Sequence, residues 1–123
     1  MSQVQFDAAI YARDWAAAWN AGDIEAVLAH FHDDAVFTSP LAARVVPESG
    51  GVIRGKEALR RYWNAAINRT PPPEFHVTSV CAGVDSLVIL FRNEQGVDRA
   101  EVLRFKDGLV TEGHGTYAVA SAG

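Results

Sequence analysis

The stretch DWAAAWNAGDIEAVLAHFHDDAVFTSP, residues 14–40, constrains the fold more than any other part of the sequence. Its first half predicts a helix, because Trp15 and Trp19 lie four residues apart and so share one apolar face. Gly22 can adopt the left-handed conformation that ends a helix, and Asp23 can cap the start of the next one. We therefore expect two helices joined by a sharp turn.

The second of these helices is expected to lead directly into a strand. Apolar residues recur at helical spacing over residues 24–31, and the pattern breaks at Asp33 and Asp34. Residues 35–39 have the short apolar and β-branched character of a strand, which Pro40 ends. The opening of the chain thus predicts helix, helix and strand in that order.

The remainder of the chain predicts one more helix and a strand-rich end. Residues 41–55 contain Pro47 and the paired glycines Gly50 and Gly51, and they predict an irregular loop. Residues 56–69 have apolar side chains on one face, among them Tyr62 and Trp63, and they predict a third helix. Four strands separated by turn residues are expected at residues 75–82, 86–93, 97–106 and 109–118.

This order of elements predicts an α+β fold. Strands joined by tight turns, such as the one at Asp107 and Gly108, pair in antiparallel fashion. We expect three helices to pack on a strongly curved antiparallel or mixed sheet, which forms a cone with a central pocket. The chain, residues 1–123, is expected to be a single domain with its core over about residues 6–118.

Composition and charge exclude several classes of partner. The basic residues are scattered among acidic ones and the net charge is −4, so no basic surface for nucleic acid is expected. Cys81 is the only cysteine, and it cannot form an intrachain disulfide. The first ten residues lack a secretion signal, and the apolar run at 87–91 is too short to span a membrane. We expect a cytoplasmic protein that binds neither nucleic acid nor membranes.

No metal or cofactor site is expected. His30 and His32 are two residues apart, so on a helix their imidazoles point to different sides and cannot share a tetrahedral site. The sequence contains no HExxH, CxxC, GxSxG or glycine-rich phosphate motif. Any chemistry must come from acid–base and aromatic side chains.

Three segments resemble the nuclear transport factor 2-like superfamily, which includes ketosteroid isomerases and SnoaL-like polyketide cyclases. They are WNAGDIEAVLAHFHDDAVFTSP, GKEALRRYW and AEVLRFKDGLVTEGHG, at residues 19–40, 55–63 and 100–115. The resemblance implies a cone-shaped fold, a pocket for a small hydrophobic molecule, and a homodimer formed through the outer face of the sheet. Apolar residues expected on that outer face support the dimer. They are Val80, Ala82, Ile89, Ala100 and Val102.

The resemblance also implies roles for three residues. In the isomerase branch an aspartate base precedes the proline of the first strand, and here that position is Ser39, so steroid isomerase activity is not expected. Trp15 occupies the position of the isomerase tyrosine, and its indole N–H can donate one hydrogen bond. Glu101 matches the isomerase acid. A desolvated Glu101 would have a raised pKa and stay protonated, whereas pairing with Arg99 or Arg92 would keep it ionised.

The last strand leaves two registers open. If the turn at 107–108 sets the register, Gly113 and Gly115 face the pocket and His114 points away from it. A single bulge would exchange the faces and bring His114 into the pocket with Glu112. The turn favours the first register.

We accordingly expect Glu101, Trp15 and His114 to be the candidate catalytic residues. The expected ligand-binding residues are Trp15, Phe37, Ser39, Trp63, Phe75, Val88, Leu90, Leu103 and Tyr117. The function this set predicts is cofactor-independent acid–base chemistry on a hydrophobic carbonyl compound. The alternative is a ligand-binding or dimeric interaction module of the same fold without catalytic activity, because fold alone does not decide function.

Overall fold

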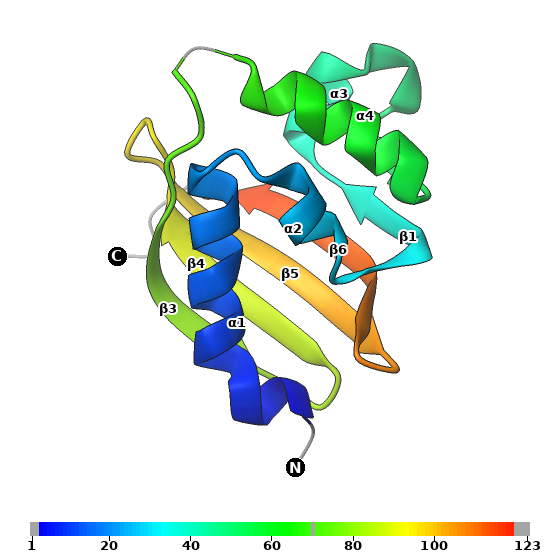
Figure 1. Cartoon of the computed structure of the whole chain (residues 1–123). Helices are drawn as coiled ribbons and strands as arrows, with labels where there is room; N and C mark the ends of the chain where they lie inside the picture. The colour runs from blue at the N-terminus through cyan, green and yellow to red at the C-terminus, as the bar shows by residue number, and fades with distance from the viewer. Residues whose placement is uncertain (1–2, 70, 120–123) are drawn as a thin grey trace.

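A computed structural model describes residues 3–69 and 71–119 of the chain (Figure 1). The helices are α1 (Gln3–Asn20), α2 (Ile24–Leu28), α3 (Pro40–Val45) and α4 (Lys56–Ile67), with a 3₁₀ turn at Pro47–Ser49. The strands are β1 (Phe31–Thr38), β2 (Val52–Arg54), β3 (His76–Ala82), β4 (Ser86–Arg92), β5 (Asp98–Lys106) and β6 (Leu109–Tyr117).

The six strands form one open, mixed sheet in the order β2-β1-β6-β5-β4-β3. β1 and β6 pair in parallel, and every other neighbouring pair is antiparallel. Figure 1 shows α1, α2 and α4 on one face of the sheet. α1 packs on β3 and β4, whereas α4 packs on β1 and β2. The predicted α+β architecture is confirmed.

The turn between the first two helices forms as expected. Gly22 has a φ of 70°, and the Asp23 carboxylate accepts a hydrogen bond from the backbone N–H of Ala26 at 3.1 Å. The second helix is shorter than predicted, since α2 ends at Leu28. Phe31 was expected in that helix, but it begins β1 and pairs with Val110 of β6. Strand pairing outweighs the helical spacing of these residues.

The segment after β1 is more regular than the predicted loop. Ser39 caps α3 because its Oγ accepts a hydrogen bond from the N–H of Leu41 at 3.1 Å, and Pro40 occupies the first helical turn. The chain then forms the short strand β2, in which Ile53 pairs with Phe37 of β1. A serine followed by proline is a helix-start signal, and it explains the helix that the sequence interpretation missed.

The faces of β4 are the reverse of those expected. Ile89 lies opposite Glu101, whose side chain faces the helices, so Ile89 is buried on the inner face. Val88 and Leu90, which were expected to line the pocket, lie on the outer face and are only half buried. The prediction was wrong because residues 87–91 are apolar throughout and contain no polar residue to mark a face.

A bulge in β3 also changes the expected outer face. The register shifts between Val77 and Ser79, and as a result both Val77 and Val80 pack against the core. The outer face therefore carries Val88, Leu90, Ala100 and Val102. These four residues are half buried, although α1, α2 and α4 all lie on the opposite face. Val80, Ala82 and Ile89 were also expected there, but Val80 pairs with Ile89 and Ala82 with the buried Leu87, so all three share the register of the inner face.

Candidate functional site

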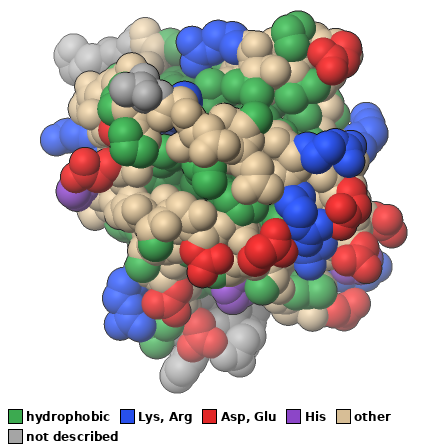
Figure 2. All heavy atoms as spheres, turned by 45° about the horizontal axis from the view of Figure 1, so that its top comes forward, with side chains coloured by type: hydrophobic (Ala, Val, Ile, Leu, Met, Phe, Trp, Pro, Cys, Tyr) green, Lys and Arg blue, Asp and Glu red, His purple; other side chains and the backbone are tan. Residues whose placement is uncertain are grey.

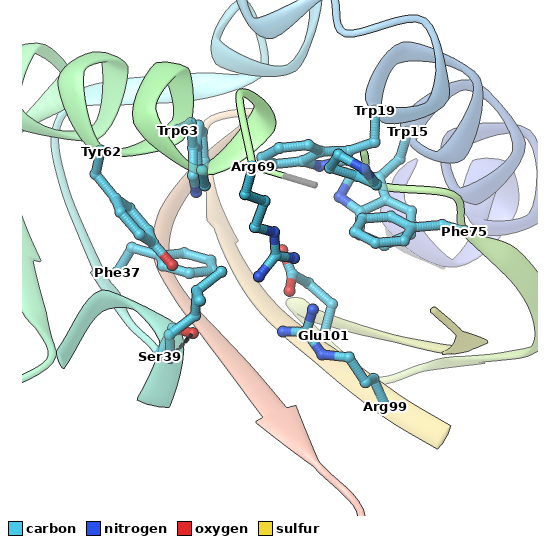
Figure 3. A pocket seen from close by; sticks show the side chains of 13 residues that line it. Trp15, Trp19, Phe37, Ser39, Tyr62, Trp63, Arg69, Phe75, Arg99 and Glu101 are labelled. Carbon is cyan, nitrogen blue, oxygen red and sulfur yellow. Dashed lines mark hydrogen bonds between the residues drawn. The ribbon is translucent and has the colours of Figure 1, made fainter. Parts of the chain in front are cut away.

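A pocket lies between α1 and α4, over β1 and β5. Its walls are largely aromatic, with Trp15 and Trp19 from α1, Phe37 from β1, Tyr62 and Trp63 from α4, and Phe75 from the segment before β3. Its polar wall residues are Ser39, Arg69, Arg99 and Glu101, which Figure 3 shows converging on the same space. The cavity itself is small, with a volume of about 30 Å³, and the empty space reaches about 390 Å³ only when the gaps between side chains and the mouth that opens to solvent are counted.

The aromatic walls are held by ring contacts rather than by hydrogen bonds. Trp15 stacks on Phe75 with 5.3 Å between ring centroids and meets Phe91 edge-on at 4.9 Å. On the α4 side, Trp63 meets Trp19 at 5.3 Å and Phe37 at 5.4 Å, both edge-on. Every one of these side chains is buried. The walls are therefore packed into position before any ligand enters.

Glu101 is the only acidic residue among the side chains that line this pocket. It is 4% exposed, and its carboxyl makes no hydrogen bond or ion pair with the described part of the chain. Burial raises the pKa of Glu101 to about 7, and the positive charge of Arg99 opposes this rise. A carboxyl that titrates near neutral pH can both give and take a proton.

Arg99 shares the inner face of β5 with Glu101 but is held by other groups. Its Nε donates to the carbonyl oxygen of Thr116 at 3.3 Å. Its guanidinium carbon lies 4.1 Å from the ring centroid of Tyr117 and 5.2 Å from that of Phe91. The guanidinium is thus positioned by aromatic stacking and one backbone contact, and its charge still acts on Glu101.

Ser39 and Tyr62 form the polar part of the opposite wall (Figure 3). Burial raises the pKa of Tyr62, and its side-chain hydrogen bond with Ser39 partly offsets that rise. Because Ser39 also caps α3, its hydroxyl is engaged in structure and has no neighbouring base to take its proton. This wall can donate hydrogen bonds but cannot serve as a strong base.

The two glycines of β6 face the interior, as expected, because Gly113 pairs with Leu103 and Gly115 with Glu101. The reason differs from the expected one, since the register shifts between Arg104 and Phe105 and does not run unbroken from the turn. A Cβ on Gly113 would lie 2.8 Å from Cδ2 of Phe37, and a Cβ on Gly115 would lie 3.1 Å from Nη2 of Arg99. The glycines make room for these two side chains. His114 lies on the outer face, where its Nδ1 is 2.6 Å from the Thr38 hydroxyl oxygen.

The predicted site residues divide into two groups. The structure brings six of them to the pocket, namely Trp15, Phe37, Ser39, Trp63, Phe75 and Glu101. Leu103 is fully buried beside Gly113, and Tyr117 stacks on Arg99 without lining this pocket. His114 lies on the outer face together with Val88 and Leu90, and none of the three lines this pocket.

Sequence interpretation did not assign the other residues that line the pocket, which are Trp19, Leu41, Tyr62, Ala66, Arg69, Pro73 and Arg99. Trp19 lies one helical turn after Trp15, and this spacing is a signal that could have placed both in the pocket. Tyr62 was treated as a core residue. Arg69 follows the end of α4, and no pattern in the sequence indicates that its side chain turns back into the pocket.

The rest of the described surface gives little sign of other chemistry. No group of three or more metal-binding side chains occurs within residues 3–69 and 71–119. No helix in these ranges is long and apolar enough to cross a membrane. In the view of Figure 2, hydrophobic side chains occupy the centre of the face shown and charged side chains surround them.

A family model and a solved structure both match most of this chain, and they indicate the same family. Residues 12–113 match the model of the SnoaL-like domain. A SnoaL-like protein of unknown function from Burkholderia thailandensis is 36% identical, with a TM-score of 0.86 over 93% of this chain and 96% of the other. Comparison with curated proteins gives no match.

Two more distant structures share the fold. Bal32a, from a soil-derived mobile gene cassette, is 23% identical with a TM-score of 0.77, and the match covers 96% of this chain and 93% of Bal32a. TerC, co-crystallised with polyporic acid, is 17% identical with a TM-score of 0.73, and the match covers 89% and 90% of the two chains.

Proposed function

The chain belongs to the SnoaL-like domain family, and from this premise we propose that it binds a small hydrophobic carbonyl compound and transfers a proton on it. The family fold supports a ligand-binding or isomerase-type protein. The observation that carries the proposal is Glu101, a buried carboxyl without a partner, on the wall of an aromatic pocket. TerC was co-crystallised with the small organic molecule polyporic acid, which supports the same kind of ligand.

The proposed chemistry is enolisation. The ionised Glu101 takes a proton from the carbon next to the carbonyl group, the C–H electron pair moves into a new C=C bond, and the carbonyl oxygen becomes an enolate. The indole N–H of Trp15 and the phenol of Tyr62 are the proposed donors to that oxygen. The protonated Glu101 then returns the proton to a carbon or oxygen of the ligand, and the carboxylate is restored.

Deuterium exchange tests this step without knowledge of the natural substrate. The protein is incubated with 2-tetralone in D₂O, and loss of the α-proton signals is followed by NMR. We expect wild type to accelerate exchange, and Glu101→Gln to slow the catalysed reaction by about 100-fold or more. The exposed Glu48→Gln is the matched control and should leave the rate unchanged. Equal rates for wild type and Glu101→Gln would exclude Glu101 as the proton-transfer group.

A non-catalytic module remains the second candidate, and the outer face of the sheet favours an assembly role. Val88, Leu90, Ala100 and Val102 form an apolar strip that the helices leave uncovered. We propose that a second copy of the chain covers this strip, so that the protein is a homodimer with the two pockets on its outside. The dimer is compatible with either function of the pocket.

A further inference from the structure

The pocket has an excess of hydrogen-bond donors that the described chain does not satisfy. Trp19 is 7% exposed and lines the pocket, yet its indole Nε1 is buried without a hydrogen-bond partner. The Nε of Arg69 is also buried without a partner. Buried donors of this kind cost free energy unless an acceptor reaches them. Two donors from different elements therefore lack an acceptor in the same space.

Arg99 adds further donors. It is 8% exposed, and its one hydrogen bond within the described chain uses Nε, so Nη1 and Nη2 have none. Gly115 lets this guanidinium approach the strand closely, because a Cβ there would lie 3.1 Å from Nη2. Tyr117 and Phe91 hold the guanidinium by its faces, which leaves its edge free for an acceptor.

The charges point in the same direction. Two guanidinium groups and one carboxyl line the pocket, and Arg69 is 3.5 Å from a further carboxylate, that of Glu94. Together these four side chains are neutral when Glu101 is ionised and carry +1 when it is protonated. Because burial favours the protonated form of Glu101, the empty pocket lacks about one negative charge.

We infer that the ligand of this pocket is a small aromatic carboxylate, bound by Arg99 and Arg69 and accepting a further hydrogen bond from Trp19. The inference rests on the proposed function in that it places the ligand in the same pocket. The carboxylate supplies the missing charge, and planar guanidinium groups bind carboxylates in a two-point geometry. The aromatic ring packs against the wall that Trp15, Phe75 and Trp63 form. In its protonated form Glu101 donates to the bound anion or to a carbonyl group on the same ligand, and its ionised form is the proton acceptor of the proposed reaction.

Benzoate and benzamide form a matched pair for the test, because they share shape and a carbonyl oxygen but differ in charge. The indole N–H signals of the three tryptophans are followed by NMR during titration, with the Trp19 signal assigned from Trp19→Phe. We expect benzoate to bind about tenfold or more tightly than benzamide. We also expect the Trp19 signal to move downfield with benzoate, because a new acceptor reaches its N–H.

Arginine variants assign the preference to the pocket. Arg99→Gln and Arg69→Gln should each bring the two affinities to within about threefold of one another. Arg61→Gln, an exposed change on the same helix as Trp63, is the control and should retain the full preference. If Arg99→Gln does not fold, Arg99→Lys and the salt dependence of benzoate binding to wild type replace it. Salt screens the charges of such a site, so we expect it to lower the affinity for benzoate and to leave the affinity for benzamide unchanged.

The outcomes separate this inference from the proposed function. Equal binding of benzoate and benzamide, or a preference that persists in both arginine variants, overturns the anionic ligand. In that case, Glu101-dependent exchange of 2-tetralone would still support proton transfer. If neither compound moves an indole signal, an aromatic carboxylate is excluded as the ligand. If benzoate binds as expected but Glu101→Gln exchanges as fast as wild type, the carboxylate site stands and the proton-transfer function fails.

Discussion

The guanidinium of Arg99 stacks on the ring of Tyr117, at 4.1 Å from guanidinium carbon to ring centroid, and forms no ion pair with the Glu101 carboxyl two residues away. Both side chains occupy the inner face of β5. If the two formed an ion pair, the pKa of Glu101 would fall below its ordinary value. Without that contact, burial dominates and the pKa of Glu101 rises to about 7. The position of Arg99 therefore keeps both a proton-transfer group and a free cation in one pocket.

The raised pKa of Glu101 predicts that stability depends on pH. The folded-state pKa of Glu101 is about 7 against an ordinary value of 4.5, so the folded protein binds the proton more tightly and loses stability as pH rises through this range. Glu101→Gln cannot ionise. We expect its free energy of unfolding, relative to wild type, to increase by roughly 3 kcal/mol from about pH 4 to about pH 8.

Urea denaturation at several pH values measures this difference. Glu48→Gln removes an exposed carboxyl from the 3₁₀ turn and should track wild type throughout. A relative stability of Glu101→Gln that is constant between about pH 4 and pH 8 would mean that Glu101 titrates normally in the folded protein.

Benzoate binding should weaken as pH rises above about 7. Ionisation of Glu101 places a second negative charge beside the bound carboxylate, so each further pH unit should lower the affinity by up to tenfold. The positive charge of Arg99 favours this ionisation, whereas burial opposes it, and the charge of Glu101 also acts on the buried phenols of Tyr11 and Tyr62. Calorimetric titration across this range, with Glu101→Gln as the control whose affinity stays flat, checks the prediction.

The parts of the fold that the sequence predicted are those with strong local signals. Gly22 and Asp23 form the expected helix boundary. His114 lies outside as expected, but through a register shift between Arg104 and Phe105 rather than through the turn at 107–108 alone. The faces of β4 could not be predicted, because an apolar residue at every position from 87 to 91 gives no alternation. The bulge in β3 likewise leaves no mark in the pattern of its residues.

The candidate site was also predicted only in part, because only some of its residues lie in segments with a local sequence signal. Glu101 and Trp15 were found through a resemblance in segments with a defined order and spacing, and strand alternation placed Glu101 inside. Arg69 depends on how the chain leaves α4, which is a tertiary property. The absence of an ion pair between Arg99 and Glu101 depends on Tyr117, which is distant in sequence. Contacts between elements cannot be read from one sequence, whereas the spacing of apolar residues within an element can.

Gly113→Ala should destabilise the protein more than Gly115→Ala. The new Cβ at 113 would lie 2.8 Å from the ring of Phe37, which packs edge-on against Trp63 and has little room to move. Overpacking of this kind costs about 1–3 kcal/mol. At 115 the nearest atom is the end of the Arg99 side chain at 3.1 Å, which can shift. Thermal unfolding of the two variants gives the comparison, and a larger loss for Gly115→Ala would contradict this account of the pocket floor.

The proposed homodimer predicts a mass of about twice 13.3 kDa by light scattering at micromolar concentration. Val102→Glu places a charge in the middle of the outer face and should give a monomer. Ile10→Glu is the control, because Ile10 is an exposed apolar residue on α1 away from that face and its change should leave the mass unaltered. A monomeric wild type would exclude the dimer.

Ser39 has a structural role that predicts different effects for two substitutions. Ser39→Ala removes the acceptor for the N–H of Leu41 at the start of α3, so it should lower the free energy of unfolding by about 1 kcal/mol. Ser39→Asp keeps an acceptor for that N–H, and we expect most of this loss to be avoided. Wild type should not isomerise a β,γ-unsaturated ketosteroid rapidly, because the neutral Ser39 holds the position of the isomerase base and Glu101 lies on the opposite wall. Ultraviolet absorbance measures the turnover of the steroid. Rapid turnover by wild type would show that another group takes the proton. Activity confined to Ser39→Asp would confirm that this wall lacks only the carboxylate.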